Sequence, residues 1–335
     1  MTVPSGTVPS GTVPPGTVHF VLPEPTAPSG GHEFDRRVAG LLGLREVRVG
    51  GRWPLDGDLR GLARALADVP DGHVALLDGL VACAAPEVLR PHAGRVRVVV
   101  LVHLPLADEV GLPARVAAEL DARERECLRS ADAVVATSPA AAARIAARHG
   151  LHGVHVVVPG VDPAPPAVGT DGSSRLLCVA SLTPRKGHDV LLAALRGVDA
   201  PWTCAFVGPG EPPAGLDDRV EVTGPLTGAA LADRYARADL FVLASRAETY
   251  GMVVTEALAR GLPVIASAVP DALGGGGLLL PPGDVGAFTR ALRRWFADDR
   301  WRADLRALAR ARRAELSTWD STARDLAAVL ANLRP

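Results

Sequence analysis

Short apolar runs alternate with helical segments along the chain, and they do so in two separate series. In the first series the apolar runs lie at residues 18–23, 73–79, 95–105, 132–138 and 154–160. Segments with helical periodicity lie between them, as at residues 59–69, 118–131 and 140–150. Apolar strands that alternate with helices are typical of a parallel sheet with helices on both faces, because such strands are buried on both sides. The pattern predicts a doubly wound, Rossmann-like α/β domain over residues 17–160.

A second series of the same kind follows residues 161–174, a segment rich in Pro, Gly and Ser that we expect to be a linker. Its apolar runs lie at residues 175–181, 202–208, 220–224, 239–245 and 263–267. They predict a second Rossmann-like domain over residues 175–315. Open α/β sheets bind ligands outside the carboxyl ends of their strands, so two such domains predict a central cleft that both sheets face.

The two ends of the chain differ from these series. Residues 1–16 repeat a Val-Pro-Ser/Pro-Gly-Thr unit, which cannot form a packed element, and we expect a disordered leader there.

A helix is expected directly after the first strand. Its apolar residues Phe34, Val38, Leu41 and Leu42 recur at helical spacing and predict that this face lies in the core.

The charged residues narrow the class of ligand. A formal net charge of −1 offers no basic surface for nucleic acid, so no nucleic-acid partner is expected. No dinucleotide G-x-G-x-x-G motif occurs at the first turn of either domain, and no P-loop motif occurs at all.

The chain has 36 Lys and Arg residues, of which Lys186 is the one lysine. Arg185 and Lys186 precede an expected helix, and two cations beside free helix amides predict a phosphate site.

Cysteine usage and hydropathy indicate the cellular compartment in which we expect the chain to lie. Cys83, Cys127, Cys178 and Cys204 are far apart and mostly within apolar runs, so we expect buried free thiols in a reducing cytoplasm. No run of eighteen apolar residues and no secretory signal is present, which favours a cytoplasmic protein.

Two carboxylates flank one expected helix start. Glu248 lies in a loop after the apolar run 239–245, and Glu256 lies about five residues into the following helix. An anion on the free amides near Gly251 and Met252 would lie between them. A carboxylate can accept hydrogen bonds from two neighbouring hydroxyls, so the pattern suits a phosphate with a sugar on each side. Taken singly, each glutamate is better explained without a ligand, Glu248 as a helix-dipole acid and Glu256 as a solvated surface acid.

Together these motifs resemble the signature of the retaining glycosyltransferases of family 4, which have the GT-B fold. The resemblance extends over most of the chain from Val18. It rests on E-x7-E in ETYGMVVTEALARGLPVIAS, with PSGG, LVHLPL, VVPGVD, TPRKG and LLLPPGD in the expected order. It implies that residues 17–160 bind the acceptor, that residues 175–315 bind the nucleotide sugar, and that a helix within residues 316–335 returns to the first domain. Trp319, Leu326 and Leu330 would form the apolar stripe of that helix.

The resemblance also implies roles for single residues. Glu256 would hold the ribose of the donor, Glu248 the transferred sugar and Lys186 the diphosphate. The amides of Gly251 and Met252 would assist. Tyr250 is also expected at this donor site. Gly30 and Gly31 would allow the backbone to approach the phosphate and sugar of the donor closely. His103 would lie near the reacting carbon, and we place it with Glu248 and Lys186 among the catalytic residues.

The chain departs from the family at one position. The family usually has an arginine five residues before the lysine, and this chain has Ser181 there. The second phosphate cation is therefore missing from its usual place in the donor site. Arg185 or Arg246 could replace it from neighbouring turns.

The function implied is transfer of a hexose from a UDP- or GDP-linked sugar to a hydroxyl acceptor, with retention and without a metal ion or other cofactor. The acceptor could be a small molecule, a glycan or a lipid-linked sugar, and contact with a membrane surface is the less favoured alternative. Two other functions stay open. One is a sugar-nucleotide epimerase or hydrolase of the same fold, and the other is a non-catalytic protein that binds a sugar nucleotide.

Overall fold

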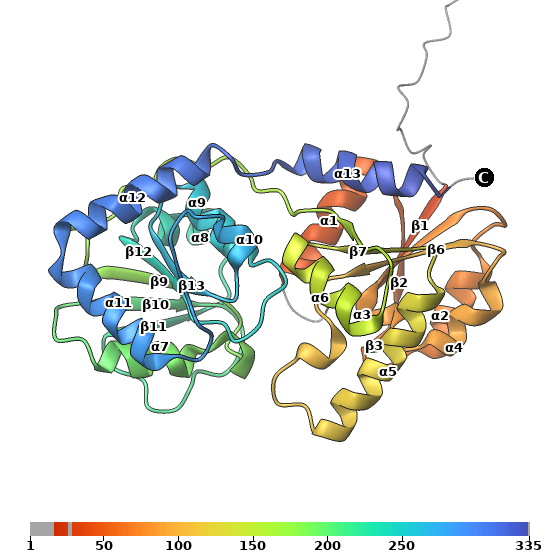
Figure 1. The fold of residues 1–335 in the computed structure, drawn as a ribbon, viewed down its shortest axis with the longest axis horizontal. Coiled ribbons are helices and arrows are strands. Elements are labelled where there is room, and N and C mark those ends of the chain that lie inside the picture. The colour runs from red at the N-terminus through yellow and green to blue at the C-terminus, as the bar shows by residue number, and fades with distance from the viewer. Residues whose placement is uncertain (1–16, 26–28, 334–335) are drawn as a thin grey trace, which may run out of the picture.

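The computed structural model describes residues 17–25 and 29–333, which form two α/β domains (Figure 1). The leader expected at residues 1–16 lies outside the described residues. The first domain holds a parallel sheet in the order β2-β1-β5-β6-β7-β8. Its strands are β1 (Val18–Pro23), β2 (Arg45–Val49), β5 (Val74–Asp78), β6 (Arg97–Val102), β7 (Ala133–Ala136) and β8 (His155–Val156).

Helices cover both faces of this sheet, as the unbroken apolar runs predicted. Side chains alternate along β1, so that Phe20 and Leu22 pack on one face and Val21 packs on the other. The face of Phe20 is covered by α1 (Gly30–Leu42) and α13 (Trp319–Ala331). The opposite face is covered by α2 (Leu59–Ala67), α3 (Gly79–Ala82), α4 (Pro86–Leu89), α5 (Ala114–Ser130) and α6 (Pro139–His149).

The second domain repeats the architecture with a parallel sheet in the order β11-β10-β9-β12-β13-β14. Its strands are β9 (Arg175–Val179), β10 (Thr203–Val207), β11 (Val220–Gly224), β12 (Leu240–Leu243), β13 (Val264–Ser267) and β14 (Leu278–Leu280). Its helices are α7 (His188–Arg196), α8 (Gly228–Ala236), α9 (Met252–Ala259), α10 (Pro270–Leu273), α11 (Val285–Ala297) and α12 (Asp299–Arg313). Two doubly wound sheets confirm the predicted fold class.

The chain crosses between the domains twice, and the two crossings touch. Helix α13, drawn in blue, lies over α1 of the first domain (Figure 1). The ring of Trp319 meets that of Phe34 edge-on with centroids 6.1 Å apart, and Leu326 and Leu330 are fully buried. The amide of Val161, on the outgoing crossing, donates to the carbonyl of Ser317 on the returning one at 3.0 Å. Because hinges are formed by a few loop residues between domains, these two adjacent crossings are where a hinge would lie.

Two local expectations were incomplete. Leu41 does not belong to the buried face of α1, because its side chain is 48% exposed while Ala39 is buried. The edge strand β2 was not expected, since its exposed Arg and Glu side chains hide the apolar pattern. A small antiparallel pair, β3 (Gly51–Arg52) with β4 (Asp56–Gly57), follows it. Among the described residues no helix is both long and apolar enough to cross a membrane.

Candidate active site

The winding of the second sheet reverses between β9 and β12, which are hydrogen-bonded neighbours. From β9 the chain moves outward to β11, and it then returns to the other side of β9 to build β12 to β14. The loops that leave β9 and β12 therefore diverge and open a crevice at the carboxyl edge of the sheet. Lys186 follows β9 and Glu248 follows β12, so both lie at this crevice.

The turn that carries Lys186 is pressed against the end of β12. Residues Pro184–Lys186 form a single 3-10 turn, and Gly187 closes it with a φ of 66°. A Cβ atom at Gly187 would lie 2.0 Å from the carbonyl oxygen of Ala244, so only glycine fits there. The amide of Arg246 donates to the carbonyl of Arg185 at 2.8 Å and ties the two loops together.

This packing brings Lys186 and Glu248 into a largely buried ion pair. The Nζ atom of Lys186 lies 2.5 Å from Oε1 of Glu248, and the Oγ atom of Ser245 donates to the same oxygen at 2.8 Å. Burial of Glu248 favours its neutral form, but Lys186 and Arg185 outweigh this, and the pKa of Glu248 falls below its usual value. Glu248 is therefore an ionised carboxylate in the crevice.

The two arginines expected to replace the missing cation lie in different places. The guanidinium of Arg185 lies 3.6 Å from Oε2 of Glu248 and also pairs with Glu109 of the first domain at 3.3 Å. Arg246 forms two hydrogen bonds to Asp189 on α7, at 2.9 and 2.6 Å. Arg185 thus joins the Lys186–Glu248 pair, whereas Arg246 is held away from it. The backbone of Ser181 accepts from the amide of Thr183 in the same turn.

Glu256 occupies the fifth position of α9, the helix that follows the loop of Glu248. Its Oε2 atom accepts a hydrogen bond from the hydroxyl of Tyr235 at 2.9 Å, and the guanidinium of Arg260 lies over that ring. Burial is the main cause that raises the pKa of Glu256. Sequence reasoning missed Tyr235, although it is one of two tyrosines in the chain. No pattern in the sequence links it to Glu256, because α8 and α9 are separated by a strand.

Gly251 directly precedes helix α9, and its backbone conformation there favours glycine. Gly251 has a φ of 96°, and a Cβ atom there would lie 2.5 Å from the side chain of Val269. The side chain of Met252 reaches across to the first domain, 3.4 Å from the position of a Cβ atom on Gly30. Contrary to expectation, the side chain of Tyr250 packs within the core of the second domain, and the residue is 5% exposed.

The first domain contributes a cluster around His103, after β6. The Nε2 atom of His103 is 2.7 Å from Oδ1 of Asp35, on α1, and Asp78 lies at the end of β5 nearby. A Cβ atom on Gly31 would lie 3.1 Å from the imidazole ring. Burial lowers the pKa of His103, but the charges of Asp35 and Asp78 raise it to about 9 overall. His103 is therefore an imidazolium at neutral pH.

Direct hydrogen bonds join this cluster to the loop of Glu248. The hydroxyl of Thr249 donates to the carbonyl of His103. The hydroxyl of Ser138, at the start of α6, donates to the carbonyl of Thr249 at 2.7 Å. The loop of Glu248 in the second domain is therefore in direct contact with the part of the first domain that carries His103.

Two sets of three side chains among the described residues have ligating atoms within 4.8 Å of one another: Asp35, Asp78 and His103, and Asp121, Glu124 and His149. In both sets the Nε2 atom of the histidine already shares a hydrogen bond with a carboxylate, at 2.7 and 2.9 Å. We interpret both as hydrogen-bonded clusters, and the absence of a metal requirement stays a prediction.

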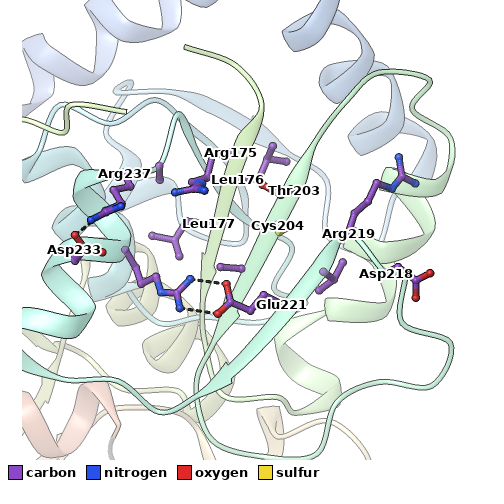
Figure 2. Close-up of a pocket in the computed structure, with 14 residues that line it drawn as sticks. Arg175, Leu176, Leu177, Thr203, Cys204, Asp218, Arg219, Glu221, Asp233 and Arg237 are labelled. Carbon is purple, nitrogen blue, oxygen red and sulfur yellow. Dashed lines mark hydrogen bonds and ion pairs between the residues drawn. The ribbon is translucent and has the colours of Figure 1, made fainter. Parts of the chain in front are cut away.

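A hollow of about 550 Å³ lies on the far edge of the second sheet (Figure 2). It is lined by Arg175, Thr203 and Val220, which begin β9, β10 and β11. Several of its charges are paired within the protein, as Arg234 is with Glu221 and Arg237 with Asp233. Open α/β sheets bind ligands at the carboxyl edge, so this hollow at the amino edge is not the site.

Comparison with known proteins agrees with this geometry. The sequence model of Glycosyltransferase Family 4 matches residues 16–165, and that of Glycosyl transferases group 1 matches residues 173–298. A D-inositol 3-phosphate glycosyltransferase of Xylanimonas cellulosilytica is 32% identical over 241 residues, which are 60% of this chain and 57% of that protein. One from Kineococcus radiotolerans is 30% identical over 248 residues, with the same two shares. The chain thus spans little more than half the length of these relatives.

Solved structures share the fold. Anabaena HepE in complex with UDP-glucose superposes with a TM-score of 0.74 at 16% identity, covering 94% of this chain and 99% of that one. Sucrose-phosphate synthase from Thermosynechococcus elongatus gives a TM-score of 0.72 at 22% identity, covering 91% and 96%. The two sheets therefore form the GT-B fold. Since the two family matches together account for most of both domains, the chain belongs to the family 4 glycosyltransferases.

Proposed function

We propose that this chain transfers a hexose from a nucleoside diphosphate sugar to a hydroxyl acceptor, with retention of configuration and without a metal ion. The observation that carries the proposal is the position of Lys186, Glu248 and Glu256. Lys186 and Glu248 pair at the reversal point of the second sheet, and Glu256 lies on α9, whose first residue Met252 faces Gly30 of the first domain. A cation between two carboxylates suits a diphosphate with a sugar at each end.

The ion pair of Lys186 and Glu248 explains how the site receives its donor. Lys186 exchanges the carboxylate of Glu248 for the diphosphate, and Glu248 is released to accept hydrogen bonds from the transferred sugar. Arg185 lies close enough to supply the second cation. Glu256 accepts from the ribose hydroxyls, with Tyr235 fixing its orientation.

In the reaction the bond between the anomeric carbon and the diphosphate oxygen breaks. A bond from the acceptor oxygen forms on the same face of the sugar, and the acceptor proton passes to the leaving phosphate. Lys186 and the first amides of α9 stabilise the charge that develops on that phosphate, which is the largest contribution such a site can make. No protein nucleophile is required by this scheme.

The donor base and the acceptor follow from the comparisons only as proposals. A structural neighbour binds UDP-glucose, which favours a UDP-linked sugar over a GDP-linked one. The curated relatives are named for D-inositol 3-phosphate, which makes a polyol the first acceptor to try. A glycan or lipid-linked acceptor stays an alternative.

The test begins with thermal unfolding in the presence of UDP-, GDP-, ADP- and TDP-linked sugars. A binding donor raises the unfolding temperature by mass action, and a flat panel contradicts the proposal. Mass spectrometry then follows the product with candidate acceptors. A glycoside that forms only with acceptor supports transfer. Free sugar without acceptor indicates a hydrolase, an isomerised donor indicates an epimerase, and binding without turnover indicates a binding protein.

A further inference from the structure

Asp35 is a buried carboxylate that contacts the proposed active site only through His103. Its side chain is 1% exposed, whereas that of His103 is 17% exposed. A ligand in the cleft can therefore touch the imidazole but not the carboxylate. The Oδ1 atom of Asp35 is bonded to His103, and its Oδ2 atom is buried without a hydrogen-bond partner. A buried carboxylate with one free oxygen depends on a nearby cation for its stability.

The surroundings hold the imidazole ring in one orientation. Phe34 meets it edge-on with ring centroids 5.4 Å apart, and Gly31 lies beneath it without a side chain. Gly31, Phe34 and Asp35 all belong to the first two turns of α1. One helix therefore supplies the packing surface, the clearance and the hydrogen bond that fix His103.

The position of the ring at this end of α1 makes the carboxylate necessary. The amino-terminal end of a helix carries partial positive charge, which disfavours a cation beside it. The groups that act electrostatically on His103 are Asp35 on α1 and Asp78 at the end of β5. His32, which lies on the same turn of α1 as Asp35, acts electrostatically on Asp78. Of these, Asp35 alone is bonded to the ring. It offsets both the helix end and the burial of the imidazole.

We propose that Asp35 is a positioning residue, which keeps His103 protonated and oriented so that its imidazolium faces the transferred sugar and the leaving phosphate. This assigns His103 an electrostatic role and excludes it as a base for the acceptor hydroxyl at neutral pH. The direction that His103 faces rests on the proposed function, whereas its pairing with Asp35 does not.

The first test is a titration of the histidines by NMR in the full chain, without donor or acceptor. The His103 signal is assigned by its loss in His103→Gln. We expect a midpoint near pH 9 in the wild type, and a midpoint at least one unit lower in Asp35→Asn, which keeps the size of the side chain but loses its charge. A wild-type midpoint at or below 6.5, or an unchanged midpoint in Asp35→Asn, overturns the proposal.

A matched control comes from the second buried pair, His149 with Glu124, which lies between α5 and α6. Glu124→Gln should change the His149 signal and leave that of His103 in place, while Asp35→Asn should do the reverse. If both variants shift both signals, the effect is a general loss of structure and the proposal fails. Because no substrate is present, this result is independent of whether the chain transfers a sugar.

The second test uses turnover, once a donor and acceptor are known. Asp35→Asn should lower kcat at least tenfold with a donor KM within threefold of wild type, and it should move the alkaline limb of the kcat profile to lower pH. Asp35→Glu, which retains the charge, should restore the alkaline limb. A uniform loss of activity at every pH, with the limb unmoved, would mean that Asp35 is only structural.

Discussion

The ammonium of Lys186 and the carboxylate of Glu248 lie 2.5 Å apart at the ends of two adjacent strands, with exposed side-chain fractions of 15% and 8%. Each neutralises the other in the absence of donor. The pair therefore keeps two charges compatible with burial, and under the proposed function it separates when the donor offers both partners a replacement. Glycine at position 187 makes this approach possible, because any side chain there would meet Ala244.

Removing one partner of the Lys186–Glu248 ion pair should lower the free energy of unfolding more than removing both partners. Lys186→Met leaves the carboxylate of Glu248 buried without its main counter-charge, and we expect a loss of about 3 kcal/mol in the free energy of unfolding. Lys186→Met with Glu248→Leu should recover much of that loss, because no charge is then buried. Urea unfolding of both single variants and the double variant measures the coupling. Additive losses would show that the two side chains do not stabilise each other.

Donor affinity should separate the two candidate arginines. Arg185→Ala removes a guanidinium 3.6 Å from Glu248, and we expect at least a tenfold weaker Kd for the nucleoside diphosphate sugar, or about 1.4 kcal/mol. Arg246→Ala is the control, because Asp189 holds that side chain away from the crevice. Calorimetric titration gives both constants. Equal losses in the two variants would contradict the assignment to Arg185.

The sequence predicted the parts of the site that depend on chain order. Lys186 and Glu248 each follow an apolar run, and parallel strands bring their carboxyl ends to one edge, so their proximity follows from topology alone. The buried strands were equally clear, since Phe20, Val21 and Leu22 are all apolar and the sheet is covered on both faces.

The missed features depend on which way a side chain points. Tyr250 lies between two residues of the cleft, yet it turns into the core, and the sequence around it does not reveal this. Nothing in the sequence singles out Asp35 on α1, and it is the return of β6 that brings His103 against it. Tyr235 reaches Glu256 from a different helix. Such contacts join residues distant in the chain, and no local periodicity encodes them.

Stability should fall in alkaline solution because of His103. Its pKa of about 9 in the folded chain exceeds the ordinary value of 6.5, so the folded state holds a proton that the unfolded state loses. The stabilisation is complete below pH 6.5 and disappears as the pH rises through 9; it amounts to about 3 kcal/mol. Urea unfolding of wild type and Asp35→Asn between pH 6.5 and 9.5 measures it.

The comparison with Asp35→Asn is needed because the raised pKa values of three buried cysteines, Cys83, Cys178 and Cys204, also make stability depend on alkaline pH. They do so equally in both proteins, and the difference between the two curves isolates His103. That difference should shrink steadily from pH 6.5 to 9. Parallel curves would show that the charge of Asp35 does not hold the proton on His103.

The ribose contact of Glu256 can be tested by changing both sides of it. Glu256→Ala should weaken the binding of the natural donor at least tenfold, since its carboxylate is the proposed acceptor for the ribose hydroxyls. A donor that lacks the 2′-hydroxyl should bind the wild type more weakly than the natural donor does, yet bind Glu256→Ala about as well. Tyr235→Phe removes the hydrogen bond at 2.9 Å and keeps the carboxylate, so a smaller loss is expected. If removal of the 2′-hydroxyl weakens donor binding equally in wild type and in Glu256→Ala, that hydroxyl and the carboxylate of Glu256 are not partners. The ribose then lies elsewhere.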